Sequence, residues 1–455
     1  MKSKTKAFQG GVFLGLFLIS LLMQMLINNG EVFFDASLYW ELGKECGWSV
    51  RNMTSAYRGW LLPFFFSICY KLGMLFGKEF LGYWILSSIV FAITFTILFF
   101  AVSRILEFEK DDIFVVLAGG GCGIVFWLFF RGLFTYPLSD FFAFFLSLTS
   151  LILMHAILEK QTGWYIKAIQ AFLLGLCLYG AYNIRTIYLF LAIVGIVLIT
   201  IWQIYEKKWI QTLITVLCCW GGMAVCALPQ MILNHKLFGV YVWKVPTGDL
   251  MLFQLHCGIS TGRYATYVGD MALYAARGMY FEDGSGQAIL DGLQLAEFTS
   301  YGEFFSLVLR HPLDFAGIYM RHLLNMLYPF YPNQYIKDIT RDKSLLLLVF
   351  YTILFIAVFS FVHSTKMKSK KWIWLFLILV PCFCILPGAV EIRFFIALHF
   401  IIYMYAILGI REFIMQFRVN KVKYIAGYLA GFLLYIAYAG MLLATAEFGV
   451  ALINP

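Results

Sequence analysis

The chain has 455 residues, of which 62% are apolar and only 13% are charged, and its net charge is +9. Soluble domains are about 45–50% apolar and about 25% charged, so this composition excludes a single soluble domain. The cations stand in short loops between apolar runs, a distribution typical of membrane topology rather than of nucleic-acid binding. We therefore expect an integral membrane protein that has no nucleic-acid partner.

Runs of about 20 apolar residues, each long enough to cross a bilayer, recur along the sequence. We predict an all-α polytopic protein with about 11 transmembrane helices, folded as a single integral membrane domain over residues 1–455. The first run lacks a clear cleavage site, so we expect it to be retained as a span. The expected spans are 8–28, 80–103, 113–130, 137–158, 168–184, 186–204, 209–232, 344–362, 372–388, 394–411 and 424–446.

Lysine and arginine clusters precede the first span and follow the second, fourth, sixth, eighth and tenth. These loops all fall on one side of the membrane, which the positive-inside rule makes cytoplasmic. We therefore expect a cytoplasmic amino terminus. The loops 30–79 and 234–342 then lie on the external face.

The first external loop, residues 30–79, is expected to hold two interfacial helices. The segment 60–77 is apolar enough to span, but a span there would put the lysine-rich loops outside, so we predict an interfacial or re-entrant helix. The segment 35–46 predicts the second helix, because its apolar residues recur at helical spacing on one face. These residues are Leu38, Tyr39, Leu42 and Cys46.

The second large external loop, residues 234–342, is rich in Gly, Asp and Tyr. A helix is predicted over 301–328, because Ser300 and Glu303 form a capping box at its start. Pro329 and Pro332 are expected to end it. The loop is too irregular for an independent enzyme domain, and we expect a lid or an acceptor-binding surface.

Single acids and arginines stand at the ends of the apolar runs, on the predicted external face. Ionisable groups near hydrocarbon are costly to place, so an aligned set of them indicates a functional site. The main members of this set are Asp35, Arg58, Arg131, Asp140, Arg185, Glu391 and Arg393.

Asp35 and Arg58 each have a structural and a functional interpretation. Asp35 is either the N-cap of the first interfacial helix or a general base at the membrane boundary. Arg58 either extends its side chain to lipid headgroups or clamps a phosphate with its planar guanidinium.

Asp140 enters an apolar run, where it either caps the fourth span or pairs with Arg131, a metal or a substrate. Arg185 follows Asn183 between two apolar runs and has no acid nearby in the sequence. We therefore expect a lipid phosphate or a distant carboxylate as its partner.

Glu391 and Arg393 are two residues apart and would not face each other on a helix, so each is expected to meet another span. Among the histidines, His256, His311 and His322 are retained as weak candidates because they are external.

Four motifs, taken in order, resemble the GT-C superfamily of integral-membrane glycosyltransferases, which includes protein O-mannosyltransferases, lipid A aminoarabinose transferases and many bacterial cell-envelope enzymes. The motifs are FFDASLYWEL, YRGWLLPFFFSICYKLGMLFG, YPLSDFFAFFLSL and LPGAVEIRFFIALHFIIYMY. The resemblance covers most of the chain.

The resemblance implies a catalytic acid shortly after the first span, which is Asp35, with Tyr39 as the tyrosine that follows it. It implies a second acid at Asp140 and an acid–arginine pair at Glu391 and Arg393. The implied reaction transfers a sugar from a polyprenyl-phosphate donor to a cell-envelope acceptor, which is a glycan, a lipid or a protein. Membrane lipid is the remaining partner. No cofactor is assigned, and dependence on a divalent cation stays open.

The sequence departs from many relatives, because Ala36 follows Asp35 where they carry a second acid. That leaves the second acidic role to Asp140 or Glu31. The sequence ends at Pro455, so we expect no soluble carboxyl-terminal domain of the kind some relatives have.

Three alternative functions remain open. An O-antigen-type polymerase or ligase also has a large late external loop. A polytopic transporter of lipid-linked or small solutes is disfavoured, because we find neither internal repeats nor broken helices at the membrane midplane, and the charges lie at the span ends. The third alternative is a non-enzymatic membrane scaffold.

Overall fold

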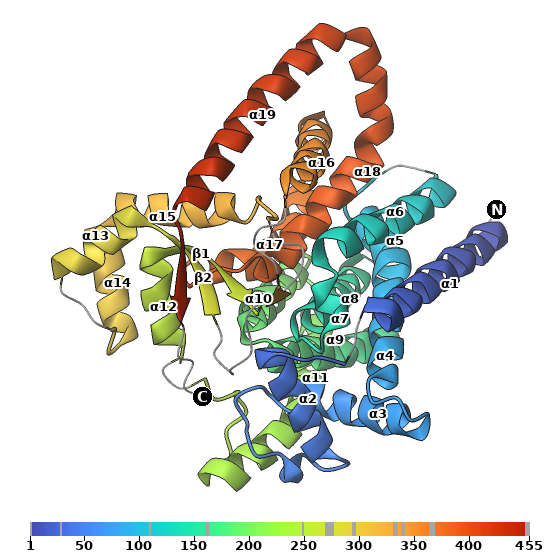
Figure 1. The fold of residues 1–455 in the computed structure, drawn as a ribbon. Coiled ribbons are helices and arrows are strands. Elements are labelled where there is room, and N and C mark those ends of the chain that lie inside the picture. Colours follow the sequence, from blue (N-terminus) through green and yellow to red (C-terminus); the bar gives the residue numbers. More distant parts are fainter. Residues whose placement is uncertain are drawn as a thin grey trace. The chain divides into compact units, whose positions relative to one another are not determined.

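The computed structural model describes residues 2–27, 30–108, 111–159, 163–247, 250–268, 277–293, 297–330, 335–337, 342–363 and 369–450 (Figure 1). The chain forms two compact units. The first comprises Met1–Val125, Leu133–Pro246 and Lys366–Pro381. The second comprises Phe126–Gly132, Thr247–Thr365 and Cys382–Pro455.

Ten helical segments of the described residues are long and apolar enough to cross a bilayer. This confirms the prediction of an all-α multi-pass membrane protein. The ninth expected span, 372–388, coincides with a shorter helix, α17 (Ser369–Ile385). The ten segments are Thr5–Ile27, Leu81–Ile105, Asp112–Phe130, Asp140–Glu159, Trp164–Ile184, Thr186–Tyr205, Trp209–Phe238, Ser344–His363, Ile392–Val419 and Lys421–Ala444.

The first unit contains helices from the first half of the chain together with most of α17, and α6 and α17 each continue past its boundaries. Its elements are α1 (Lys2–Ile27), α2 (Phe34–Cys46), η1 (Val50–Asn52), α3 (Leu61–Leu75), α4 (Leu81–Ile93), the π-helix η2 (Thr94–Leu98), α5 (Phe99–Ile105), α6 (Asp112–Phe130), α7 (Gly132–Thr135), α8 (Asp140–Glu159), α9 (Trp164–Ile184), η3 (Thr186–Tyr188), α10 (Leu189–Tyr205) and α11 (Trp209–Phe238).

Both helices predicted in the first external loop are present. The segment 35–46 forms α2, and the segment 60–77 forms α3. With 15 residues, α3 is shorter than the roughly 20 residues that a span needs. The interfacial position of both helices stays a prediction.

Helices α9 and α11 pack with their backbones in close approach. A Cβ added to Gly175 of α9 would overlap the carbonyl oxygen of Cys219 on α11, and one added to Gly222 of α11 would overlap that of Phe172 on α9. Small residues allow such close helix contacts in membranes. The contact fixes α9, and the carboxyl end of α9 carries Asn183 and Arg185 of the candidate site.

The second unit combines three long helices with a smaller region of short helices and strands. Its elements are α12 (Leu250–Ser260), β1 (Thr261–Tyr267), β2 (Arg277–Glu282), α13 (Gly284–Leu293), α14 (Tyr301–Arg310), α15 (Pro312–Asn325), β3 (Tyr335–Ile336), α16 (Ser344–His363), η4 (Ile392–Phe395), α18 (Ile396–Val419), α19 (Lys421–Ala444) and β4 (Ala446–Val450).

The four strands form one sheet in the order β3-β1-β2-β4, which the sequence analysis did not anticipate. Strand β1 pairs antiparallel with β2 and parallel with β3, and β2 pairs antiparallel with β4. Because β4 follows α19 directly, the sheet is attached to the end of that long helix (Figure 1).

The predicted helix 301–328 is wrong in one respect, because it is broken into α14 and α15. Ser300 caps α14 as expected, and its side chain accepts from the backbone N–H of Glu303. His311 then leaves the helical conformation and Pro312 starts α15. Proline lacks the N–H that a continuous helix would need at this point, but it suits the first turn of a new one. Pro332 lies outside the described residues.

Candidate functional site

Asp35 stands in the first turn of α2 and is not the cap of that helix. The N-cap is Phe33, which makes no side-chain capping bond. The Asp35 carboxylate instead pairs with the Arg58 guanidinium at 2.6 Å, and their side chains are 24% and 30% exposed. Phe34 has a φ of 43°, a strained conformation that residues other than glycine seldom adopt outside functional sites. Asp35 is therefore a partly exposed carboxylate that the Arg58 guanidinium holds.

Arg58 is presented by a turn that only glycine allows. Gly59 has a φ of 67°, and a Cβ there would overlap the main-chain and side-chain oxygens of Asn183. The Asn183 Oδ1 atom accepts hydrogen bonds from the backbone N–H groups of Trp60 and Leu61, at 3.0 and 2.9 Å. These groups start α3, so a side chain from α9 caps α3 and fixes the turn that carries Arg58.

Tyr39 also joins α2 to the end of α9. Its ring lies 5.8 Å from the Arg58 guanidinium carbon, and its hydroxyl donates to the carbonyl oxygen of Ile184 at 3.4 Å. The ring limits the positions that the guanidinium can take. Tyr39 is thus placed to position Arg58, and its expected contact with substrate stays a prediction.

A buried chain of amides supports Asn183 from α11, and the sequence analysis missed it. Asn183 donates to Gln230 at 2.9 Å, and Gln230 donates to Asn234 at 3.0 Å. Asn234 in turn donates to the carbonyl oxygens of Val242 and Lys244. All three amides are buried. Two amides four residues apart in an apolar span were the signal, because polar groups in membrane helices need partners.

Arg185 and Asp140 form a second ion pair in the same unit. Arg185 is the extended residue that ends α9, and its Nε lies 3.1 Å from Oδ1 of Asp140, the first residue of α8. Its Nη1 donates to the hydroxyl of Ser139 at 3.3 Å. The Asp140 side chain is 1% exposed and that of Arg185 is 16% exposed. Arg185 was expected to contact a lipid phosphate or a distant carboxylate, and it contacts the carboxylate of Asp140.

Glu391 and Arg393 contact each other, so the expectation that they do not face each other is wrong. Glu391 is extended and precedes the short helix η4, and its carboxylate pairs with the Arg393 Nε. The rule for residues two apart on a helix does not apply here, because Glu391 lies outside the helix that holds Arg393. Thr266 of β1 donates to Glu391 at 3.3 Å. Burial, followed by the charge of Glu391, raises the pKa of Tyr264 on the same strand.

Arg131 lies in the turn after α6, within the second unit. The expected pairing of Arg131 with Asp140 stays a prediction, while the Arg185 contact supplies Asp140 with one cation.

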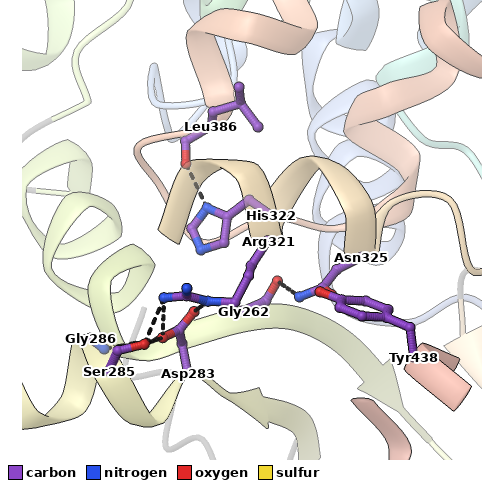
Figure 2. A network of polar contacts seen from close by, with 9 residues as sticks. All are labelled: Gly262, Asp283, Ser285, Gly286, Arg321, His322, Asn325, Leu386 and Tyr438. Carbon is purple, nitrogen blue, oxygen red and sulfur yellow. Dashed lines mark hydrogen bonds and ion pairs between the residues drawn. The ribbon is translucent and has the colours of Figure 1, made fainter. Parts of the chain in front are cut away.

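Figure 2 shows a polar network in the second unit that the sequence analysis did not identify. Asp283, between β2 and α13, accepts two bonds from Arg321 of α15, at 2.6 and 2.9 Å. Burial alone would raise the pKa of Asp283, but the bonds from Arg321, from the Gly286 N–H and from Ser285 together outweigh it and hold the pKa below its ordinary value. The network links β2, α13 and α15.

The three histidine candidates have local roles. His322 is fully buried and contacts the carbonyl oxygen of Leu386 at 2.6 Å (Figure 2). Burial lowers the pKa of His322 and of His256, which favours their neutral forms. His311 pairs with Asp314, three residues along. Among the described residues, no group of three or more His, Cys, Asp or Glu side chains is arranged to hold a metal ion.

No protein-family model matches this sequence, and no curated protein matches it. Among solved structures, the chain is similar to the archaeal oligosaccharyltransferase AglB from Archaeoglobus fulgidus, in complex with an inhibitory peptide and a dolichol-phosphate. The match covers 97% of this chain and 56% of that protein, at 12% identity and a TM-score of 0.46.

The chain thus spans about half the length of AglB. An oligosaccharyltransferase belongs to the same broad class of enzyme that the sequence resemblance implies. At this identity and TM-score, however, the match assigns neither a family nor an activity to the chain. The function is therefore argued from the chain's own residues.

Proposed function

We propose that this protein is a membrane glycosyltransferase of the GT-C type that moves a sugar from a polyprenyl-phosphate donor to a cell-envelope acceptor on the external face. The observation that carries the proposal is the pair of Asp35 and Arg58. It joins a partly exposed carboxylate to a partly exposed guanidinium at the start of a strained helix. Sugar transfer from a lipid phosphate needs one group of each kind.

The proposed reaction is a direct displacement. The oxygen of an acceptor hydroxyl forms a bond to the anomeric carbon on the face opposite the phosphate, which inverts that centre. The bond between the anomeric carbon and the phosphate oxygen breaks, and its electron pair leaves with the polyprenyl phosphate. The hydroxyl proton passes to the Asp35 carboxylate, which acts as general base.

Arg58 is the proposed ligand of the leaving phosphate. A guanidinium has five N–H donors, so Arg58 can bond a phosphate while it keeps one bond to Asp35. A phosphate that draws the guanidinium away also makes the carboxylate a stronger base, because a nearby cation lowers the pKa of an acid. Donor binding would then prepare Asp35 for the proton transfer.

The other candidate residues receive supporting roles in this proposal. Tyr39 and Asn183 position Arg58, and Asp140 orients Arg185 at the end of α9. For Arg131, Glu391 and Arg393, which belong to the second unit, substrate binding stays a prediction from the sequence. No step of the proposed reaction requires a metal ion, although a divalent cation at the phosphate stays open.

The proposal is tested by Asp35→Asn in the full-length protein reconstituted in vesicles. The assay measures release of polyprenyl phosphate from a panel of synthetic polyprenyl-phosphate hexoses and pentoses, in the presence of cell-envelope acceptor fractions. Transfer should fall roughly 10²–10⁴-fold, the usual contribution of a general base. The donor should still protect the variant thermally, because Arg58 is retained.

Asp112→Asn is the matched control. Asp112 also stands in the first turn of a helix and pairs with an arginine, Arg104, with side chains 40% and 34% exposed. Its loss should leave transfer unchanged. Near-native transfer by Asp35→Asn would assign the base to another acid. If no donor of the panel were turned over or gave thermal protection to the wild type, the glycosyltransferase proposal itself would be wrong.

A further inference from the structure

Helix α15 has two apolar faces on opposite sides. Phe315 and Ile318 are buried and pack in a core with residues of α12, α13 and α14. On the other side Leu313 is 85% exposed and Met320 is 56% exposed, with the exposed Ala316 between them. These three residues recur at spacings of three and four, so they line one stripe of the helix.

The exposed stripe continues onto the end of α14. Leu309 and Phe305 are exposed and four residues apart, whereas Phe304 and Leu307 face the same buried core. We call the five exposed residues the outer face of the α14–α15 hairpin: Phe305, Leu309, Leu313, Ala316 and Met320. Strongly exposed apolar residues gathered on two consecutive helices are unusual in water and indicate an interaction site.

The carboxyl end of α15 is bonded to α19, a long apolar helix, near the carboxyl end of α19. Tyr438 of α19 donates to Asn325 at 2.8 Å, and the two residues are drawn in Figure 2. Tyr435 donates to the carbonyl oxygen of Leu327 at 2.9 Å. Tyr438 lies six residues before the end of α19 at Ala444, which is about 9 Å along the helix axis. Figure 1 shows α15 beside this end of α19.

The position of α15 near the end of α19 indicates that the outer face contacts lipid. Helix α19 is long and apolar enough to span the bilayer, and Leu433 and Leu434 on it are strongly exposed, as lipid-facing residues are. An interfacial helix buries its apolar face about 5–10 Å into the boundary of headgroups and acyl chains. A helix fixed about 9 Å from the end of a span lies in that layer.

We propose that the outer face of the α14–α15 hairpin is seated in the lipid leaflet into which α19 emerges. Arg321 of α15 remains bonded to Asp283, which follows β2, so the hairpin and the strands stay linked. The exposed Arg310 at the hairpin's bend is placed to contact lipid phosphates. The sheet and its four short helices would thus be anchored at the membrane surface by lipid contact as well as by the chain.

The test places a photo-crosslinking amino acid, p-benzoylphenylalanine, at Leu313 or Met320 in the full-length protein. The protein is reconstituted in vesicles of phosphatidylethanolamine and phosphatidylglycerol, and adducts are identified by mass spectrometry. We expect lipid adducts at both positions, in yields within about twofold of that at Leu433, which is 71% exposed on α19.

Asp291 on α13 serves as the negative control, because it is exposed but lies off the outer face. It should give no lipid adduct. Crosslinks from Leu313 and Met320 to a second copy or to another polypeptide would overturn the proposal in favour of a protein interface. Absence of lipid adducts at both positions, with Leu433 still positive, would overturn it as well. Neither result bears on the role of Asp35.

Discussion

Arg58, Arg185 and Arg393 each contact a carboxylate of this chain, but they differ in how far substrate can reach them. The pair of Arg58 and Asp35 is partly exposed, whereas the other two pairs are largely buried. A buried ion pair gains stability only when each charge keeps its partner. Arg58 is therefore the arginine best suited to take a new phosphate, while Arg185 has a mainly structural role.

The Arg185–Asp140 pair predicts a non-additive loss of stability. Asp140→Asn or Arg185→Gln alone leaves one buried charge without its partner and should lower the free energy of unfolding by about 3–5 kcal/mol. The double variant should lose less than the sum, because it leaves no such charge. Denaturant or thermal unfolding in detergent measures all three values.

Asp112→Asn again serves as the control, since its pair with Arg104 is exposed and should be worth about 0–1 kcal/mol. Strictly additive losses at Asp140 and Arg185 would show that the two residues do not act as a pair.

The sequence identified the acids and arginines of the site but not their pairing. The distance of 45 positions between Asp140 and Arg185 leaves no periodic pattern that could match them. Helix geometry led to the expectation that Glu391 and Arg393 do not face each other. Pro387 and Gly388 just before them, however, favour a break in the helix. Because an ionised side chain near hydrocarbon is costly, each such residue is expected to have a partner. Only the fold shows which residue that partner is.

At the scale of elements, the turn before α3 predicts a specific effect of Gly59→Ala. The alanine must adopt a φ that costs about 1–2 kcal/mol, and its Cβ would also overlap Asn183. Asn183 would then lose its bonds to the start of α3, and Arg58 would move. We expect a loss of stability above 2 kcal/mol, together with a reduced rate of sugar transfer.

Gly77→Ala is the matched control for this variant. Gly77 has a φ of 64° in the same unit, but a Cβ there would meet no atom within 4 Å. It should cost only the conformational strain of about 1–2 kcal/mol and leave transfer unchanged. If both variants behaved alike, the contact of Gly59 with Asn183 would have no part in the site.

Elements governed by local sequence were predicted well, and elements governed by distant contacts were not. Helix α2 and the Ser300 cap of α14 follow from spacing and capping within one turn. The sheet depends on β4, which pairs with β2 from about 170 positions away. The break at Pro312 had a local signal, the proline itself, which the prediction of a single helix over 301–328 did not use.

At the scale of the whole molecule, the number of crossings decides which loops share a side. Ten segments are long enough to span, and α17, with 17 residues, reaches about 26 Å against a hydrocarbon core of about 30 Å. If α17 crosses, residues before α16 and after α18 lie on opposite sides. If it does not cross, they lie on the same side.

Labelling of single introduced cysteines with a membrane-impermeant thiol reagent on intact cells tests this arrangement. Gly292 of α13 and Asn420, between α18 and α19, are both exposed. The positive-inside rule, with α17 crossing, predicts that Gly292→Cys is labelled and that Asn420→Cys is labelled only after permeabilisation. The parent protein, with its ten native cysteines, gives the background. Labelling of both variants in intact cells would show that α17 does not cross. The reverse pattern would place the proposed site of sugar transfer on the cytoplasmic face.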